Sequence, residues 1–205
     1  MRLLDLFKSE AVQRHFLADD AELDAATIFA LVRDMPYLRA SDRKPETIIR
    51  EWRGTCSGKH YLLRALFAEL GLSSTLMACT IVAYLDPATT LPALMAILEP
   101  VGGRFVDVHN YLVLHTPAGD MIADATWPSG TERYGMVVNR QFHLGEHQQI
   151  AYQPIETWVV PDDVDPQAFK DALLSEHFTQ DELAARDQFI LALSQGLADI
   201  AGVDG

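Results

Sequence analysis

The stretch EWRGTCSGKHYLLRALFAELGL, residues 51–72, contains Cys56, one of only two cysteines among the 205 residues of the chain. Apolar side chains follow this cysteine at i, i+3 and i+4 spacing, which is the period of a helix with one buried face. They are Leu62, Leu63, Leu66, Phe67 and Leu70. Gly71 comes directly afterwards and is a common residue just beyond a helix end. The pattern predicts a helix from about Cys56 to Leu70, with the thiol in its first turn.

A thiol in the first turn of a helix lies among backbone N–H groups that have no intrahelical partner, at the positive end of the helix dipole. This position favours the thiolate, and a neighbouring imidazolium lowers the thiol pKa further. Gly54 and Gly58 would let a substrate backbone come close. Cys56 is therefore either a nucleophile or a small residue that packs at the helix start, as cysteine often does. Cys79, in an apolar and β-branched stretch, is predicted to be an inert core residue.

Composition and charge narrow the class of protein. The chain is 49% hydrophobic and 22% charged, which is typical of a globular protein, and its length favours a single domain, 1–205. We expect a core at about residues 45–160, with helical extensions at 1–44 and 166–200. The 29 acidic residues exceed the 16 Lys and Arg residues, and the net charge of −13 argues against nucleic acid and anionic membranes as partners.

The sequence also bears on the compartment. No stretch offers about 18 uninterrupted apolar residues, as a membrane-spanning helix requires. The first ten residues, MRLLDLFKSE, carry charges inside their apolar stretch and do not resemble a signal peptide. Two cysteines are too few for a disulfide framework, which fits a reducing compartment. We therefore expect a cytoplasmic protein that crosses no membrane and uses no cofactor or metal.

Hydrophobic periodicity outlines the order of the elements, with helices at both ends and strands between them. Besides the helix at Cys56, helical periods cover residues 4–17, 19–35, 44–52 and 166–200. Apolar and β-branched runs predict strands at residues 74–85, 104–116, 121–127 and 151–160. The last helical stretch should break near Phe178 and Thr179. This order predicts an α+β fold in which a central helix packs on an antiparallel sheet.

A thiol nucleophile needs a base, and the base needs a group that orients it. His109 lies on the strand at 104–116, and Asp124 lies on the strand that follows. If the four residues PAGD form the hairpin turn, Asp124 lies opposite Val113, roughly 13 Å from His109. For the two side chains to meet, the turn must begin nearer Thr116 or a bulge must shift the register. Otherwise His109 is only a hydrogen-bonded histidine of the sheet.

Three motifs occur in a set order: GTCSGKHYLLRALFAELGL at 54–72, VHNYLVL at 108–114 and IADATWP at 122–128. Together they resemble the transglutaminase-like superfamily, whose pattern is G-x-C before a helix ending in L-G, then a histidine heading a strand, then D-x-T. The resemblance covers about residues 45–128. It implies a transglutaminase-like, cysteine-proteinase core with a papain-like triad. In that triad Cys56 is the nucleophile, His109 the general base and acid, and Asp124 the group that fixes the imidazole.

Further side chains are candidates for the cleft around this triad. Tyr37 and Trp52 are candidate second donors to an oxyanion, the alternative being that both are packing aromatics. Trp127, just past the aspartate, would shield the triad from water. Tyr111 matches the family pattern, which often has an aromatic two residues after its histidine. Lys59 departs from that pattern, because it stands where an acidic or small residue is common.

Other polar residues offer alternatives. His60 lies one helical turn beyond Cys56 and could replace His109 as the base, tune the thiol or line the cleft. Asp107 shares the strand face of His109 and is either a second carboxylate near the site or a solvated strand residue. HLGEH at 143–147 has the H-x-x-E-H spacing of some zinc peptidases, but its flanks do not predict the helix that such a site requires. We predict no metal site there.

The expected chemistry is acyl transfer on an amide of a peptide, a protein or a small molecule. The thiolate would attack the carbonyl, the amine would leave with a proton from His109, and water or an amine would resolve the thioester. Two alternatives stay open. One is an acyltransferase that uses a small thioester donor, as the arylamine acetyltransferases do with a similar triad, and the other is a non-catalytic binding protein of the same fold. The oligomeric state is open too, since the stretch at 166–200 could pack on the core or form a dimer contact.

Overall fold

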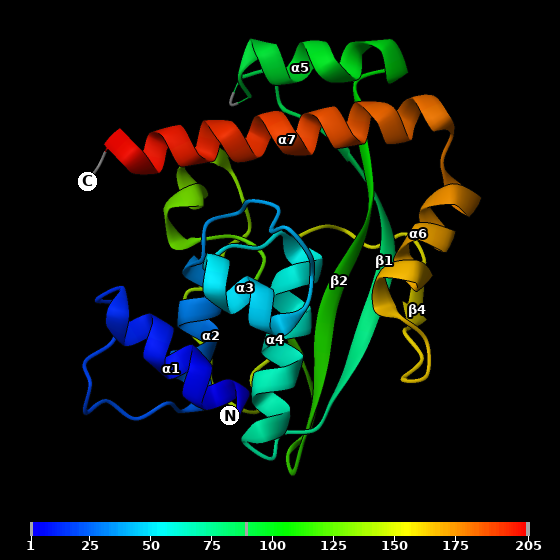
Figure 1. Ribbon diagram of the computed structural model, residues 1–205. Coiled ribbons are helices and arrows are strands. Elements are labelled where there is room, and N and C mark those ends of the chain that lie inside the picture. Colours follow the sequence, from blue (N-terminus) through cyan, green and yellow to red (C-terminus); the bar gives the residue numbers. More distant parts are fainter. Residues whose placement is uncertain (1, 89, 204–205) are drawn as a thin grey trace.

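The chain forms a four-stranded antiparallel sheet flanked by helices, as the computed structural model describes it for residues 2–88 and 90–203 (Figure 1). The helices are α1 (Leu3–Gln13), α2 (Ala25–Asp34), α3 (Pro45–Glu51), α4 (Cys56–Glu69), α5 (Pro92–Leu98), α6 (Pro166–His177) and α7 (Gln180–Val203), with 3₁₀ turns η1 (Glu99–Val101) and η2 (Ser129–Tyr134). The strands are β1 (Ser74–Tyr84), β2 (Arg104–Thr116), β3 (Gly119–Ala123) and β4 (Thr157–Val159). The predicted α+β class is confirmed.

Two long strands form the centre of the sheet, whose order is β3-β2-β1-β4. β1 and β2 pair antiparallel along their whole length, and Cys79 lies opposite His109 in this register. The β-branched and apolar residues of both strands suit a pleated surface that is covered by other elements. Helix α4 packs on both strands, which confirms the central helix that the apolar spacing after Cys56 predicts.

The β2–β3 hairpin has a tighter turn than PAGD implies. Thr116 pairs with Gly119, so that only two residues lie between the paired positions. The last pair is Leu112 with Ala123, and Asp124 follows directly. The position opposite Val113 is therefore wrong for Asp124. The turn begins at Thr116, which is the condition for Asp124 to reach His109 from the neighbouring strand.

Two predicted strands are shorter in the structure than in the sequence analysis. β3 ends at Ala123 instead of residue 127, because the backbone of Asp124 bonds to the side chains of Asn139 and Gln148 rather than to a neighbouring strand. β4 comprises only Thr157–Val159 instead of residues 151–160, a stretch in which Pro154 has no N–H to donate to a ladder.

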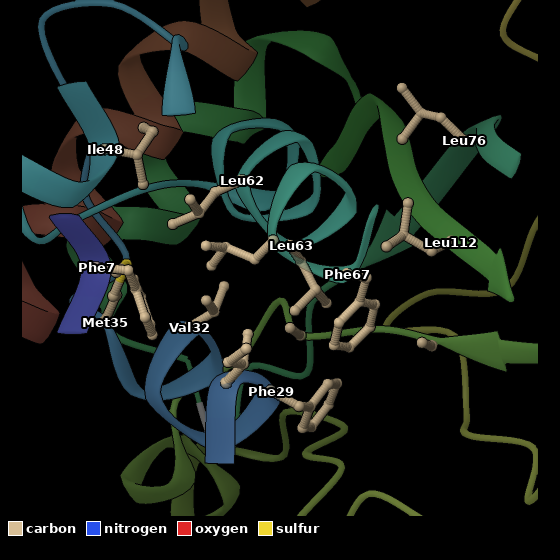
Figure 2. Close-up of a cluster of buried hydrophobic side chains, with 14 of the residues drawn as sticks. Phe7, Phe29, Val32, Met35, Ile48, Leu62, Leu63, Phe67, Leu76 and Leu112 are labelled. Carbon is tan, nitrogen blue, oxygen red and sulfur yellow. The ribbon is translucent and has the colours of Figure 1, made fainter. Parts of the chain in front are cut away.

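The larger of two hydrophobic clusters lies between α4 and the helices that precede it. Figure 2 shows the side chains of α1, α2 and α3 meeting those of α4, with two residues of the central strands beside them. The labelled members are Phe7, Phe29, Val32, Met35, Ile48, Leu62, Leu63, Phe67, Leu76 and Leu112. All ten are wholly buried. The N-terminal helices are thus part of the core that holds α4 on the sheet.

The second hydrophobic cluster lies under the C-terminal helix. α7 runs across one end of β1 and β2, with α5 on its outer side (Figure 1). The residues of this cluster include Phe105 of β2, Leu98 of α5, and Phe189 and Ile190 of α7. α6 and α7 are separated at Phe178, which has an extended backbone, and this confirms the predicted break. The stretch at 166–200 therefore packs on the core of its own chain.

Gly58, in the first turn of α4, is explained by helix packing. A Cβ at this position would lie 2.8 Å from Cδ1 of Ile48 in α3, closer than side chains approach. Its small size therefore serves the contact between α3 and α4.

Among the helices that the structure describes, none combines the length and the apolar character needed to span a bilayer.

Candidate active site

Cys56 is the first residue of α4, as predicted. Thr55 occupies the N-cap position without a side-chain capping bond, so the thiol lies beside the N–H groups of the first turn. The cysteine is only 3% exposed. The sulfur therefore lies inside the protein, and its protonation depends on the charged groups packed around it.

His109 and Asp124 form the hydrogen bond that the motif order predicts. Nε2 of His109 donates to Oδ2 of Asp124 at 2.8 Å, and both side chains are buried. Asp124 also accepts from the N–H groups of Ala151 at 2.8 Å and Thr126 at 3.0 Å. Nδ1 of His109 has no hydrogen-bond partner among the described residues. One ring nitrogen is thus fixed by a carboxylate, and the other is free to exchange a proton.

These contacts set the charges of His109 and Asp124. Burial alone would lower the pKa of His109, but the Asp124 carboxylate and the contact with Cys56 outweigh it and raise this pKa to about 10. Burial would raise the pKa of Asp124, but the charge of His109 and its hydrogen bond hold this pKa well below its usual range. The histidine is therefore an imidazolium and the aspartate a carboxylate at neutral pH.

The thiol of Cys56 is acidified by two cations. Burial would raise its pKa, but the charge of Lys170 and the neighbouring, positively charged His109 together lower it to about 6. This value lies below the pKa of His109, so the proton belongs on the imidazole and the sulfur is a thiolate. An imidazolium–thiolate pair is the resting state of an activated cysteine nucleophile.

His60 does not act as the base. Its Nδ1 donates to the carbonyl oxygen of Cys56 at 2.8 Å, and its Nε2 accepts from the N–H of Ala125 at 2.9 Å. Both nitrogens are engaged, and this pattern requires a neutral ring. Burial lowers the pKa of His60 to about 4, despite the opposing charge of Asp124. The role of His60 is to join the start of α4 to the chain that follows β3.

A cationic group that the sequence analysis missed lies on the other side of the sulfur. Nζ of Lys170, in α6, lies 3.9 Å from Sγ of Cys56, 3.2 Å from Oγ of Ser57 and 3.2 Å from Oδ1 of Asp107. Arg186 of α7 donates to the same carboxylate oxygen from Nε at 2.7 Å. Asp107 is thus the second carboxylate near the site, and not a solvated strand residue. Its carboxylate holds two buried cations next to the thiol.

Aromatic side chains surround the pair of Cys56 and His109. Tyr37 packs on Trp127 with ring centroids 4.5 Å apart, and Tyr152 lies 6.0 Å from Trp127 and 5.4 Å from His109. Burial, and next to it the charge of Cys56, raises the pKa of both tyrosines, which are therefore neutral phenols. Tyr37 and Trp127 thus lie at the site as predicted, whereas Tyr152 was missed because its predicted strand is an irregular segment.

Trp52 lies elsewhere. Its ring stacks on Phe7 at 5.3 Å and on Phe16 at 5.5 Å, within the N-terminal helices. Its backbone has a positive φ of 50° at the end of α3. As a member of the larger hydrophobic cluster it is a packing aromatic, the alternative that the sequence analysis left open.

Lys59 is a structural lysine. It is wholly buried, and its Nζ donates to the carbonyl oxygens of Arg33 at 2.7 Å and Thr126 at 3.1 Å. Burial lowers its pKa to about 7, against the favourable charge of Asp34. The lysine that departs from the family pattern thus ties α2 and the segment after β3 to the helix of the nucleophile.

The remaining candidates take no part in the proposed triad. Cys79 is buried, and burial raises the pKa of its thiol to about 12, in keeping with an inert core residue. In the HLGEH segment, Nδ1 of His147 accepts from the N–H of Ile122 at 3.2 Å. The segment is irregular, as expected. Across residues 2–88 and 90–203, the structure contains no group of three or more His, Cys, Asp or Glu side chains that could hold a metal ion.

No protein-family model matches the sequence, no curated protein matches it, and no solved structure matches the chain. The chemistry of the site is therefore inferred from its geometry and charge.

Proposed function

We propose that this protein is a thiol-dependent acyl-transfer enzyme with a transglutaminase-like core, acting on an amide through Cys56, His109 and Asp124. The observation that carries the proposal is the state of His109. Its Nε2 is held by Asp124 at 2.8 Å, its Nδ1 has no other partner among the described residues, and its charge acidifies the thiol of Cys56. These observations support the order of nucleophile, base and orienting acid that acyl transfer requires.

In the first half of the reaction the thiolate sulfur bonds to the carbonyl carbon of the substrate, and the carbonyl oxygen becomes an oxyanion. The imidazolium of His109 then donates its Nδ1 proton to the amine, the carbon–nitrogen bond breaks and a thioester remains. In the second half, water or an amine loses a proton to His109 and attacks the thioester, which restores the thiolate. The N–H groups at the start of α4 favour the oxyanion in both halves.

The site is closed as it stands. Cys56 is 3% exposed and His109 is wholly buried, so a substrate carbonyl reaches the sulfur only when the side chains above it move. Closure of this kind keeps water away from the ion pair and strengthens each electrostatic contact within it. A short acyl group is favoured over a bulky one until the covering side chains are displaced.

The test is the pH dependence of alkylation by iodoacetamide, with the modified residue located by mass spectrometry. We expect the rate at Cys56 to rise with a midpoint near pH 6, because the reagent reacts with the thiolate. His109→Asn removes the imidazolium and should move the midpoint upward. Cys56→Ser should abolish the modification.

A midpoint of about 8.5, the value of an unperturbed thiol, would overturn the proposal. So would a low midpoint in a protein that never forms an acyl–enzyme with p-nitrophenyl acetate, because Cys56 would then be acidic without being a nucleophile toward carbonyls.

A further inference from the structure

Lys170 has its three N–H donors matched to three acceptors. An ammonium group carries three donors, and the groups within reach are Sγ of Cys56, Oγ of Ser57 and Oδ1 of Asp107. The lysine is only 3% exposed. Ser57 is itself held, since its hydroxyl donates to Oδ1 of Asn110 at 2.9 Å. The hydroxyl oxygen of Ser57 and the carboxylate oxygen of Asp107 therefore hold the ammonium so that its third proton faces the sulfur.

The buried charges beside the sulfur form two groups, and only the second of them needs the anionic sulfur to be neutral. One group is His109 with Asp124. The other is Asp107 with the two cations Lys170 and Arg186, which has a surplus of one positive charge unless the thiolate is counted with it. Arg186 also contacts Asp187, but that carboxylate is exposed and solvated.

Acylation of the sulfur changes this balance. When Cys56 becomes a neutral thioester, the surplus positive charge of the Asp107 group has no partner, and one N–H of Lys170 loses its anionic acceptor. A buried charge without a partner is costly. In a tetrahedral intermediate the oxyanion is the oxygen attached to the carbon that is bonded to the sulfur. This negative charge therefore arises close to Lys170 and restores the neutrality of the Asp107 group.

We propose that Lys170 is a further catalytic residue, whose ammonium stabilises first the thiolate of Cys56 and then the oxyanion that forms on the acyl carbon. The inference rests on the proposed acyl-transfer function. It supplies the side-chain oxyanion donor for which the aromatic residues were the candidates. No proton leaves Lys170 in either half of the reaction, because it acts through its charge and its N–H donors.

Two reagents separate the two roles of Lys170. Iodoacetamide alkylates the thiolate by direct displacement and forms no oxyanion, whereas p-nitrophenyl acetate acylates it through a tetrahedral oxyanion and releases a phenolate that needs no proton. Both rates are to be measured from pH 5 to pH 9.5 in the wild-type protein, in Lys170→Met and Lys170→Arg, and in the control Lys44→Met. Lys44 is an exposed lysine at the start of α3.

In Lys170→Met we expect the alkylation midpoint to rise by about one to two pH units, and the rate to approach that of the wild type at pH 9.5. Acylation at pH 9.5 should stay about 10²-fold slower, since loss of one oxyanion donor has this effect. Lys170→Arg should recover part of both rates, and Lys44→Met should match the wild type. The other titratable groups that interact with the sulfur are unchanged in these variants: His109, Asp107, Arg186, Tyr37, Tyr152, Lys59, Tyr61 and Cys79.

Equal alkylation and acylation profiles in Lys170→Met and the wild type would overturn the inference and leave the proposed function standing. A normal acylation rate with a raised alkylation midpoint would overturn the oxyanion role. A wild-type protein that shows neither a low midpoint nor an acyl–enzyme would remove the proposed function itself.

A measurement on the wild-type protein covers the case in which Lys170→Met does not fold. With lysine labelled by carbon-13 at Cε, the Lys170 resonance should shift in step with ionisation of Cys56, near pH 6. Methylthiolation of Cys56 should abolish that step. If the Lys170 resonance responds neither to ionisation nor to methylthiolation of Cys56, the contact between Lys170 and Cys56 is contradicted.

Discussion

Two buried histidines differ in charge, one cationic and one neutral, because of the groups that each one contacts. His109 faces a carboxylate and a thiol and holds its proton, so its pKa rises to about 10. His60, with a carbonyl oxygen on one nitrogen and an N–H on the other, keeps a neutral ring and a pKa of about 4. His109 therefore has a ring nitrogen that is able to exchange a proton, while His60 is a fixed connection between α4 and the segment that carries Asp124.

His60 should make the protein less stable in weak acid. Between pH 6.5 and pH 4 the unfolded chain binds a proton at this histidine and the folded chain does not, so the free energy of unfolding falls as the pH falls. The expected slope is about 1.4 kcal/mol per pH unit for this group. His60→Gln should lack that part of the slope, and the exposed control His115→Gln should keep it. Urea denaturation at several pH values gives the answer, and equal slopes in wild type and His60→Gln would contradict the assignment.

The three residues of the proposed triad were predicted from the sequence, but the cations beside them were not. Cys56, His109 and Asp124 lie in motifs that follow one another within 69 residues, whereas Lys170 is 114 positions from the cysteine. A signal was nevertheless present. Lys170 precedes the buried Leu173 and Leu174 by three and four residues, and Arg186 precedes Phe189 and Ile190 in the same way. A cation at such a position lies on the apolar face of its helix and needs a buried partner.

At the scale of elements, the start of α4 depends on its contact with α3. Gly58→Ala would place a Cβ 2.8 Å from Cδ1 of Ile48, and this crowding should destabilise the protein by about 1–3 kcal/mol. Gly196→Ala is the matched control, because that glycine lies within α7 with nothing within 4 Å of the added carbon. It should stabilise by about 0.5–1 kcal/mol, as alanine is the better helix former. Thermal unfolding of both variants measures the difference, and a neutral Gly58→Ala would refute the packing explanation.

Elements with a strong hydrophobic period were predicted well, and those fixed by long-range hydrogen bonds were not. β2 and α4 agree with the sequence to within a residue, because each has a continuous apolar pattern. The end of β3 depends on side chains from a distant segment, Asn139 and Gln148, which bond to the backbone of Asp124. The residues around Asp124 in the sequence do not indicate these partners. The register of Asp124 could therefore be predicted only on the condition that the turn begins near Thr116.

At the scale of the whole molecule, the site lies where the two hydrophobic clusters meet. α4 brings Cys56 from the larger cluster, and α6 and α7 bring Lys170 and Arg186 from the C-terminal part of the chain. The extensions expected at both ends of the chain are thus built into the core. Helix order and sheet type could be predicted from the hydrophobic periodicity. The packing of α6 and α7 beside the start of α4 could not, because it depends on contacts between distant parts of the chain.

This arrangement supports the prediction that the chain is a single domain. We expect the loss of tryptophan fluorescence and the exposure of Cys56 to a thiol reagent to follow one transition in guanidinium chloride, because β2 contributes to both clusters. The three tryptophans belong to different parts of the fold, which makes the fluorescence a suitable overall probe. Separate midpoints for the two signals would divide the chain into two units.

The cover over Cys56 has a kinetic consequence. A reagent meets the sulfur only during brief openings of the structure, so at high concentration its rate should stop rising and settle at a plateau. The rate at the plateau equals the rate constant of local opening and should be the same for every reagent. The same burial limits the access of dissolved peroxide, so the Cys56 thiolate should oxidise more slowly than an exposed thiolate would.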